Sequence, residues 1–307
     1  MTATKPSQAT GIIYQAISGF YYVWSNDQSF VTKPRGNFRH LKMKPLVGDY
    51  VVFEPLADQE EAVGRLVEIL PRQNALLRPP VANVDFAIVV SSLREPEFSY
   101  NLLDYFLVFV ESHGIQPIIL LTKYDLLVAA LGQDQAQAQV DQIRATYQAA
   151  GYDLLVNDQT QQGLEAVKHL IQEGTYVVMG QSGVGKSTLL NQLIPAAAIE
   201  TGAISSSLNR GKHTTREVTL YRYHQGLIAD TPGFSAVDLS QIAKEDLGQY
   251  FPEIHRASLE CRFRSCLHIN EPGCQVKALV DQGQIAASRY QNYQQIFAKL
   301  QAQKPKY

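Results

Sequence analysis

The sequence of 307 residues has no long apolar run, few cysteines and no apolar leader. Because no run approaches the roughly 18 apolar residues of a membrane span, we expect no membrane association. Residues 1–10 are polar, which argues against a secretory signal and predicts a cytoplasmic protein. Three cysteines, an odd number, argue against a disulfide framework. With 45% hydrophobic and 18% charged residues, the composition excludes disorder and predicts a globular chain.

The chain also lacks a net positive charge, which on its own argues against nucleic-acid binding. Its 27 basic and 29 acidic residues give −2. These charges are unevenly distributed, however. Residues 1–80 carry +2, residues 81–249 carry −8 and residues 250–307 carry +4. An acidic centre therefore lies between two basic flanks, and the flanks are candidates for contact with RNA.

Short strands dominate the first part of the chain. Segments rich in Val, Ile, Tyr and Phe predict strands at residues 12–24, 29–32, 49–53 and 62–70. Because no long helical pattern interrupts them, we expect a small all-β barrel or sandwich over residues 1–73. Residues 74–83, with Pro79-Pro80, are predicted to be a linker. The loop at 32–45 carries five basic residues and no acidic one.

Strand and helix patterns alternate over residues 84–240, as is typical of an α/β domain with a largely parallel sheet. Six strands are predicted, at residues 84–90, 117–122, 154–157, 176–179, 218–223 and 226–230. Helices are predicted at residues 101–113, 136–150 and 164–172, and between a glycine-rich turn and residue 194. Residues 241–307 are expected to form a mostly helical domain with a cysteine-bearing loop.

A glycine-rich segment, GQSGVGKST, follows one of these strands and precedes a helix. It fits G-x-x-x-x-G-K-[ST], whose glycines turn backbone N–H groups toward phosphate oxygens at a helix N-terminus. Lys186 would reach the β- and γ-phosphates, and Ser187 would ligate Mg²⁺. A chance glycine-rich turn is disfavoured because motif and context agree. The candidate phosphate-binding residues are Gly180, Gln181, Ser182, Gly183, Val184, Gly185, Lys186, Ser187 and Thr188.

A second motif, Thr122-Lys123-Tyr124-Asp125, follows a predicted buried strand. It resembles the N-K-x-D guanine reader with Thr in place of Asn. The Asp125 carboxylate can accept hydrogen bonds from both N1–H and the N2 amine of guanine, which adenine lacks, so GTP is favoured over ATP. Lys123 would lie along the base, and Thr122 keeps a hydroxyl but loses the carboxamide. The alternatives are an ordinary turn with an Asp cap and a generic P-loop ATPase.

Two further segments resemble the switches of GTPases. In Asp230-Thr-Pro-Gly233, Asp230 would hold the Mg²⁺ shell and the Gly233 N–H would meet the γ-phosphate. Residues 211–216 offer a Mg²⁺-ligating threonine, Thr214 or Thr215. The predicted catalytic group is Lys186, Thr215, Asp230 and Gly233, with Mg²⁺ held by Ser187, Thr215 and Asp230.

The residue after Gly233 is Phe234, where many GTPases place a water-orienting Gln. Slow intrinsic hydrolysis and an activating partner are therefore expected. His213 is interpreted as a solvated loop residue rather than a catalytic one.

The order of the motifs is unusual, because the base reader at 122–125 precedes the phosphate loop at 180–188. Moving the last three strands to the front restores the order of Ras-like GTPases. We therefore predict a circularly permuted G domain, in which the second switch leads directly into the C-terminal region.

All three cysteines lie in one short segment with a histidine between them. Cys261, Cys266, His268 and Cys274 form a Cys3His set, which suits a closed, tetrahedral structural zinc site. Three unrelated buried cysteines are the alternative, and a redox role fits poorly because no C-x-x-C is present. Arg256, Arg262 and Arg264 surround the set and form either a solvated face or a patch for RNA phosphates.

These features together resemble the RsgA family of circularly permuted GTPases over nearly the whole chain. The resemblance rests on the permuted order, on the four nucleotide motifs and on the Cys3His set with Glu271-Pro272 inside it. It implies an N-terminal OB-fold, a permuted G domain at 84–240 and a zinc-binding domain at 241–307. It also implies a monomer that binds GTP and GDP, contacts 16S rRNA and acts in late maturation of the 30S subunit.

The implied mechanism is a ribosome-stimulated GTPase in which the basic flanks hold rRNA and hydrolysis drives release. Two alternatives stay open. One is a nucleotide-gated RNA-binding module whose nucleotide site is a static structural element. The other is a P-loop NTPase with a non-ribosomal partner.

Overall fold

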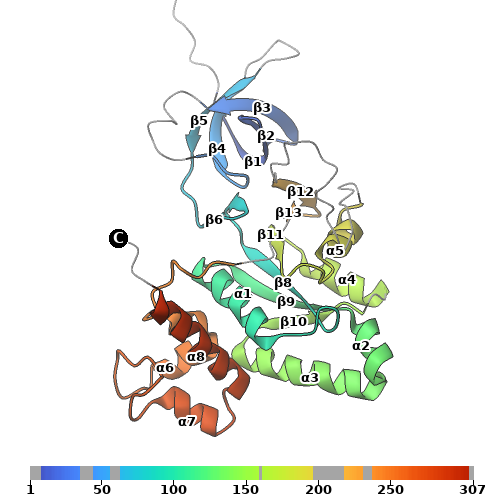
Figure 1. Ribbon diagram of the computed structural model, residues 1–307. Coiled ribbons are helices and arrows are strands. Elements are labelled where there is room, and N and C mark those ends of the chain that lie inside the picture. The colour runs from blue at the N-terminus through green and yellow to red at the C-terminus, as the bar shows by residue number, and fades with distance from the viewer. Residues whose placement is uncertain are drawn as a thin grey trace, which may run out of the picture. The chain divides into compact units, whose positions relative to one another are not determined.

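The computed structural model describes residues 8–34, 44–55, 63–158, 161–195, 218–230 and 237–303. Its contacts divide the chain into two compact units. The first contains residues 1–86, 171–178 and 193–234, and the second contains residues 87–170, 179–192 and 235–307. Figure 1 labels most of the helices and strands of both.

The first unit begins with a closed five-stranded barrel. Its strands are β1 (Ala9–Ile17), β2 (Phe20–Ser25), β3 (Gln28–Pro34), β4 (Tyr50–Glu54) and β5 (Gly64–Ile69). They follow the order β1-β2-β3-β5-β4, and β4 pairs back to β1. The β3–β5 pair is parallel and the others are antiparallel. This Greek-key closure confirms the predicted OB-fold.

The single strand predicted over residues 12–24 is wrong. The chain turns at Ser18-Gly19, and both residues have a positive φ (49° and 84°). Two central residues with positive φ are typical of the tight turns that join hairpin strands. The segment therefore forms the β1–β2 hairpin, with Ile17 opposite Phe20. Apolar residues continue on both sides of the turn, so the hydrophobic pattern alone did not mark it.

The predicted linker at 74–83 is a hairpin of β6 (Ala75–Leu77) and β7 (Pro80–Ala82). Its base is fixed by Asn74, whose side chain hydrogen-bonds both N–H and C=O of Val84. Ala82 N–H donates to Val47 O at 2.8 Å, and Asn83 donates to Gly48 O at 2.9 Å. The hairpin is therefore packed on the segment that precedes β4.

Three more strands complete the first unit: β11 (Gly174–Met179), β12 (Thr219–Tyr223) and β13 (Gly226–Asp230). β13 lies between the other two, parallel to β11 and antiparallel to β12. The outer edge of β12 pairs with β1 of the barrel, at Gln15 opposite Thr219.

The second unit holds the other strands predicted for the α/β part. β8 (Phe86–Ser92), β9 (Gln116–Thr122) and β10 (Asp153–Val156) are neighbours in the order β10-β9-β8, and β9 and β10 are parallel. Its helices are α1 (Tyr100–Ser112), α2 (Tyr124–Leu131), α3 (Gln133–Ala150), α4 (Gln161–Leu170) and α5 (Lys186–Leu193). All six predicted strands are thus present, whereas α2 was not predicted.

The C-terminal part is helical, as expected, with the 3-10 helix η3 (Leu247–Tyr250) and α6 (Pro252–Ser258), α7 (Gln275–Asp281) and α8 (Ala287–Ala302). Arg289 of α8 is 1% exposed and binds both carboxylate oxygens of Glu253 on α6, at 2.7 and 3.0 Å. It also donates to Asp104 of α1 at 2.6 Å. A buried ion cluster therefore joins the C-terminal helices to α1. Within the described residues, no helix is long and apolar enough to cross a membrane.

Candidate functional site

The predicted phosphate loop links β11 to α5, as the motif requires. Its three glycines have φ values of 145°, 82° and 97° at Gly180, Gly183 and Gly185. Any side chain at position 180 would meet backbone as well, because a Cβ there would lie 2.1 Å from Val90 O. Glycine is thus required at the start of the loop by both conformation and space. The next helix begins at Lys186, so its N-terminal N–H groups lie at the end of the loop.

Lys186 is held against the loop that it follows. Its Nζ donates to Gly180 O at 2.7 Å and to Gln181 O at 2.6 Å. Burial lowers the pKa of this ammonium group to about 8. It therefore stays mostly protonated at neutral pH, and two of its three N–H donors anchor it to the loop. This geometry suits a lysine that presents a fixed positive charge to a phosphate.

Thr122 joins the predicted base reader to the phosphate loop. Its Oγ1 donates to Val184 O at 2.7 Å in a buried hydrogen bond. Its own carbonyl accepts from Leu93 N–H at 3.0 Å. The hydroxyl thus braces the loop although the carboxamide of the usual Asn is missing.

The other residues of this motif lie where β9 turns into α2. Lys123 has a φ of 60° and donates through Nζ to Glu95 O. Tyr124 OH exchanges hydrogen bonds with Gln133 and Gln137 of α3, so this side chain packs against a helix. Asp125 is exposed in the first turn of α2, which leaves its carboxylate accessible to a ligand.

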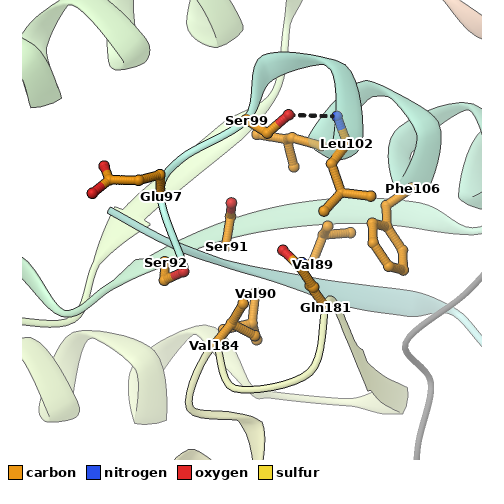
Figure 2. Close-up of a pocket in the computed structure, with 11 residues that line it drawn as sticks. Val89, Val90, Ser91, Ser92, Glu97, Ser99, Leu102, Phe106, Gln181 and Val184 are labelled. Carbon is orange, nitrogen blue, oxygen red and sulfur yellow. Dashed lines mark hydrogen bonds between the residues drawn. The ribbon is translucent and has the colours of Figure 1, made fainter. Parts of the chain in front are cut away.

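A small cavity of about 10 Å³ lies below the phosphate loop. Figure 2 shows Gln181 and Val184 of the loop beside Val89 and Val90 of β8. Ser99, whose Oγ accepts from Leu102 N–H at 3.2 Å, caps α1 at its rim. This volume holds about one water molecule, so the cavity is a packing gap and a nucleotide would bind outside it.

Asp230 ends β13 in the first unit and is half-buried, and burial raises the pKa of its carboxyl. A divalent cation at this carboxylate would offset the cost of its burial. The remaining switch residues, Thr214, Thr215 and Gly233, lie outside the described residues, as do His213 and Phe234.

The Cys3His set is assembled as predicted. The ligand atoms of Cys261, Cys266, His268 and Cys274 all lie within 4.8 Å of one another. His268 Nδ1 is 3.6 Å from Cys261 Sγ and 3.5 Å from Cys274 Sγ. A tetrahedral centre with metal–sulfur bonds of about 2.3 Å and metal–nitrogen bonds of about 2.0 Å separates sulfur and nitrogen by about 3.5 Å. The two sulfur–nitrogen separations at His268 therefore match those around a bound metal ion.

Three side chains fix the backbone of residues 261–274, the candidate metal-binding loop. The Glu271 carboxylate accepts from the N–H groups of Leu267, Ile269 and Asn270 at 3.0–3.1 Å. Tyr293 OH donates to Leu267 O at 2.8 Å, and Tyr290 OH donates to His268 O at 2.6 Å. Outer contacts of this kind orient metal ligands. The tyrosines were not predicted, although their spacing of three residues on one helix was a signal.

The arginines near this loop have different surroundings. Arg256 donates to Ala149 O and Ala150 O at the end of α3, at 3.4 and 3.1 Å. Arg262 and Arg264 are exposed, and the guanidinium carbon of Arg262 lies 5.3 Å from the centroid of the Phe263 ring. Two of the three arginines around the Cys3His set are therefore exposed, which is compatible with either a solvated face or a patch for RNA phosphates.

Comparison with known proteins gives concordant matches. The model of the RsgA GTPase family matches residues 69–240, and that of the RsgA N-terminal domain matches residues 10–63. The protein named small ribosomal subunit biogenesis GTPase RsgA from Enterococcus faecalis is 48% identical over 302 residues, which cover 97% of each chain. The chain belongs to the RsgA GTPase family. Its enzymatic activity is accordingly GTP hydrolysis.

Other RsgA proteins and structures agree. The Halalkalibacterium halodurans protein of the same name is 46% identical over 95% of this chain and 97% of its own. The crystal structure of YloQ, a circularly permuted GTPase, matches with a TM-score of 0.82 and 38% identity, covering 98% of each chain. YjeQ from Thermotoga maritima matches with a TM-score of 0.83 and 30% identity, covering 97% of this chain and 100% of its own. The chain thus has the predicted circularly permuted GTPase fold.

Proposed function

We propose that this protein acts in the biogenesis of the small ribosomal subunit as a GTPase that the 30S particle stimulates. The name shared by its relatives supports the process. The observation that supports a shared nucleotide site is the Thr122–Val184 hydrogen bond, which joins residues 122–125 to residues 180–188. GTP would be bound by 122–125 and 180–188, with Mg²⁺ at Ser187, Asp230 and Thr215.

The activation by 30S is tested by GTP turnover with and without purified particles. Because Phe234 replaces the usual water-orienting Gln, turnover alone should be slow and particles should accelerate it. Lys186→Ala should abolish both rates. Lys168→Ala removes a part-exposed lysine that pairs with Glu165 on α4, and should change neither. Equal turnover with and without particles would contradict the activation.

The base specificity of Asp125 has its own test. Asn at this position offers an amide donor where guanine presents an amine, so Asp125→Asn should weaken GTP binding. It should strengthen binding of xanthosine triphosphate, whose 2-oxo group accepts that donor. Competition among GTP, ATP and xanthosine triphosphate for binding to each protein measures the change. A wild-type protein that prefers ATP would be a generic P-loop ATPase.

We further propose that the exposed arginines of the metal-binding loop contact rRNA phosphates, and that hydrolysis drives release from the particle. The positive charge of residues 250–307 supports this contact. Arg262→Glu with Arg264→Glu should weaken 30S binding and flatten its salt dependence. Arg144→Glu on α3, which reverses another part-exposed arginine, should have little effect. If both variants bind alike, the arginines form only a solvated face.

The metal is proposed to be one structural zinc ion, because three thiolates and one imidazole match the preferences of zinc and leave no position for water. Metal analysis of the purified protein should find about one zinc per chain, and Cys274→Ser should lose it. Retention of zinc by this variant would exclude the site.

A further inference from the structure

A row of three residues crosses three neighbouring strands of the first unit. Asp230, at the end of β13, is the register partner of Thr219 on β12. Thr219 is in turn the register partner of Gln15 on β1, and Gln15 Nε2 donates to Thr219 Oγ1 at 3.3 Å. The carboxylate proposed for the Mg²⁺ shell thus stands two strands away from the barrel.

A second contact joins the same strand to the barrel. Arg222 of β12 donates through Nη1 to Asp27 Oδ1 at 2.6 Å, at the turn between β2 and β3. Its guanidinium carbon is 4.7 Å from the centroid of the Trp24 ring, which stacks on Tyr14 at 4.3 Å. The register of β1 against β2 shifts at Tyr14, and such bulges redirect side chains. The bulge therefore lies within the stacked pair of Tyr14 and Trp24, and Arg222 contacts the Trp24 ring of that pair.

The position of β12 and β13 in the chain gives these contacts a function. The two strands form the hairpin between the predicted switch segments 211–216 and 230–233. Five register pairs, from Thr219–Asp230 to Tyr223–Gly226, join them. A displacement of Asp230 would therefore move β12 and its contacts with the barrel.

We propose that the β12–β13 hairpin transmits the state of the nucleotide to the barrel, through Gln15–Thr219 and through Arg222 with Trp24 and Asp27. This rests on the proposed role of Asp230 at the nucleotide. Coupling of this kind is reciprocal, so a ligand that holds the barrel in one arrangement alters the nucleotide affinity by the same factor. The barrel is then a sensor as well as a binding module.

The exposure of the Arg222 contact suits this role. The Arg222 side chain is 47% exposed and that of Asp27 is 90% exposed. Exposed ion pairs contribute little to stability, so the contact can break and form again without unfolding the barrel. A buried pair would fix the hairpin to the barrel in one position.

The chain carries a reporter at this contact, because Trp24 is its single tryptophan. Indole emission responds to a charge close to the ring. We expect the emission maximum of the full-length protein to differ between GDP and a non-hydrolysable GTP analogue. Hydrogen exchange of β1 and β2 should differ between the same two states, which gives a readout independent of fluorescence.

Two variants and one control test the path. Arg222→Ala and Gln15→Ala should each reduce the difference in exchange between the two nucleotides, and the double variant should lose it. Arg144→Ala on α3 removes a part-exposed arginine of an ion pair elsewhere and should keep the full difference. Calorimetry measures nucleotide binding in parallel.

The outcomes separate the two proposals. If both nucleotides bind but wild-type emission and exchange are the same with each, the coupling is wrong while the proposed GTPase site stands. If the double variant keeps the full difference, these contacts do not carry the signal. If neither nucleotide binds, the proposed site and the coupling fail together.

Discussion

An exposed ion pair and a buried ion cluster join flanking parts of the chain to its α/β elements. Arg222 connects β12 to the barrel through Asp27 at the surface. Arg289 connects α8 to Glu253 of α6 and to Asp104 of α1, and its side chain is only 1% exposed. The first contact can open at little cost, whereas the second cannot open without leaving charges buried and unpaired.

The buried cluster is also completely hydrogen-bonded. The Asp104 carboxylate accepts from Tyr147 and Asn292 in addition to Arg289. Burial opposes the charge of Arg289, but Asp104 and Glu253 raise the pKa of its guanidinium well above the usual value. The guanidinium of Arg289 therefore stays charged throughout the physiological range. Breaking the buried cluster should therefore cost far more free energy than breaking the exposed Arg222–Asp27 pair.

The largest effect is expected for Arg289→Ala. It leaves the carboxylates of Asp104 and Glu253 buried without their cation, and should cost about 3–5 kcal/mol of unfolding free energy. Urea denaturation measures this cost. Arg144→Ala, which breaks a part-exposed ion pair with Asp141, is the control and should cost about 0.5 kcal/mol or less. A loss below about 1 kcal/mol for Arg289→Ala would mean that the buried cluster stabilises the protein no more than the exposed Arg222–Asp27 pair.

A smaller effect is expected for Glu271→Ala in the metal-binding loop. The variant leaves the N–H groups of Leu267, Ile269 and Asn270 without their acceptor, and should weaken metal affinity about 10- to 100-fold. Competition with a chromophoric chelator measures it. Glu260→Ala, an exposed neighbour, should leave the affinity unchanged. Equal affinities would mean that the ligands position themselves without this carboxylate.

Thr122→Val tests a contact that is buried but carries no charge, the hydrogen bond from Thr122 Oγ1 to Val184 O. The variant leaves a buried carbonyl without its donor, so GTP affinity should fall about fivefold to tenfold, or about 1 kcal/mol. Thr122→Ser keeps the hydroxyl and should bind GTP like the wild type. Calorimetric titration compares the three proteins, and equal binding by the Val variant would show that the brace is dispensable.

The smallest effect on stability is expected for Arg222→Ala. Its ion pair and its contact with Trp24 are exposed, so the unfolding free energy should change by about 1 kcal/mol or less. Denaturation of this variant beside Arg289→Ala completes the comparison. A loss of several kcal/mol would contradict the small stability cost expected for an exposed ion pair.

The sequence predicted what short motifs and periodicity encode. The glycine-rich turn between a strand and a helix, the permuted order of strands and the all-β N-terminal part were predicted because each depends on local residue patterns. The Cys3His cluster was identified from ligand type and spacing. The domain boundaries at 73, 83 and 240 and the roles of the individual site residues stay predictions.

Contacts between distant residues could not be predicted. Nothing in the local sequence relates Arg289 to Asp104, which precedes it by 185 residues. The pairing of Gln15 with Thr219 was equally hidden, because register across strands from separate parts of the chain leaves no periodic signal. In contrast, Ser18-Gly19 carried a local turn signal that the surrounding apolar residues outweighed.

The hairpin at 74–83 determines where this protein can be cut into fragments. A barrel fragment ending at residue 73 would lose Ala82 and Asn83, which bind Val47 O and Gly48 O. Gly48, with a φ of 90°, packs so closely on Ala82 that a Cβ would lie 2.1 Å from Ala82 O. Such a fragment would expose residues 47–48, which the hairpin covers, to water and to proteases. A recombinant barrel should therefore extend beyond residue 84, so that it includes the hairpin.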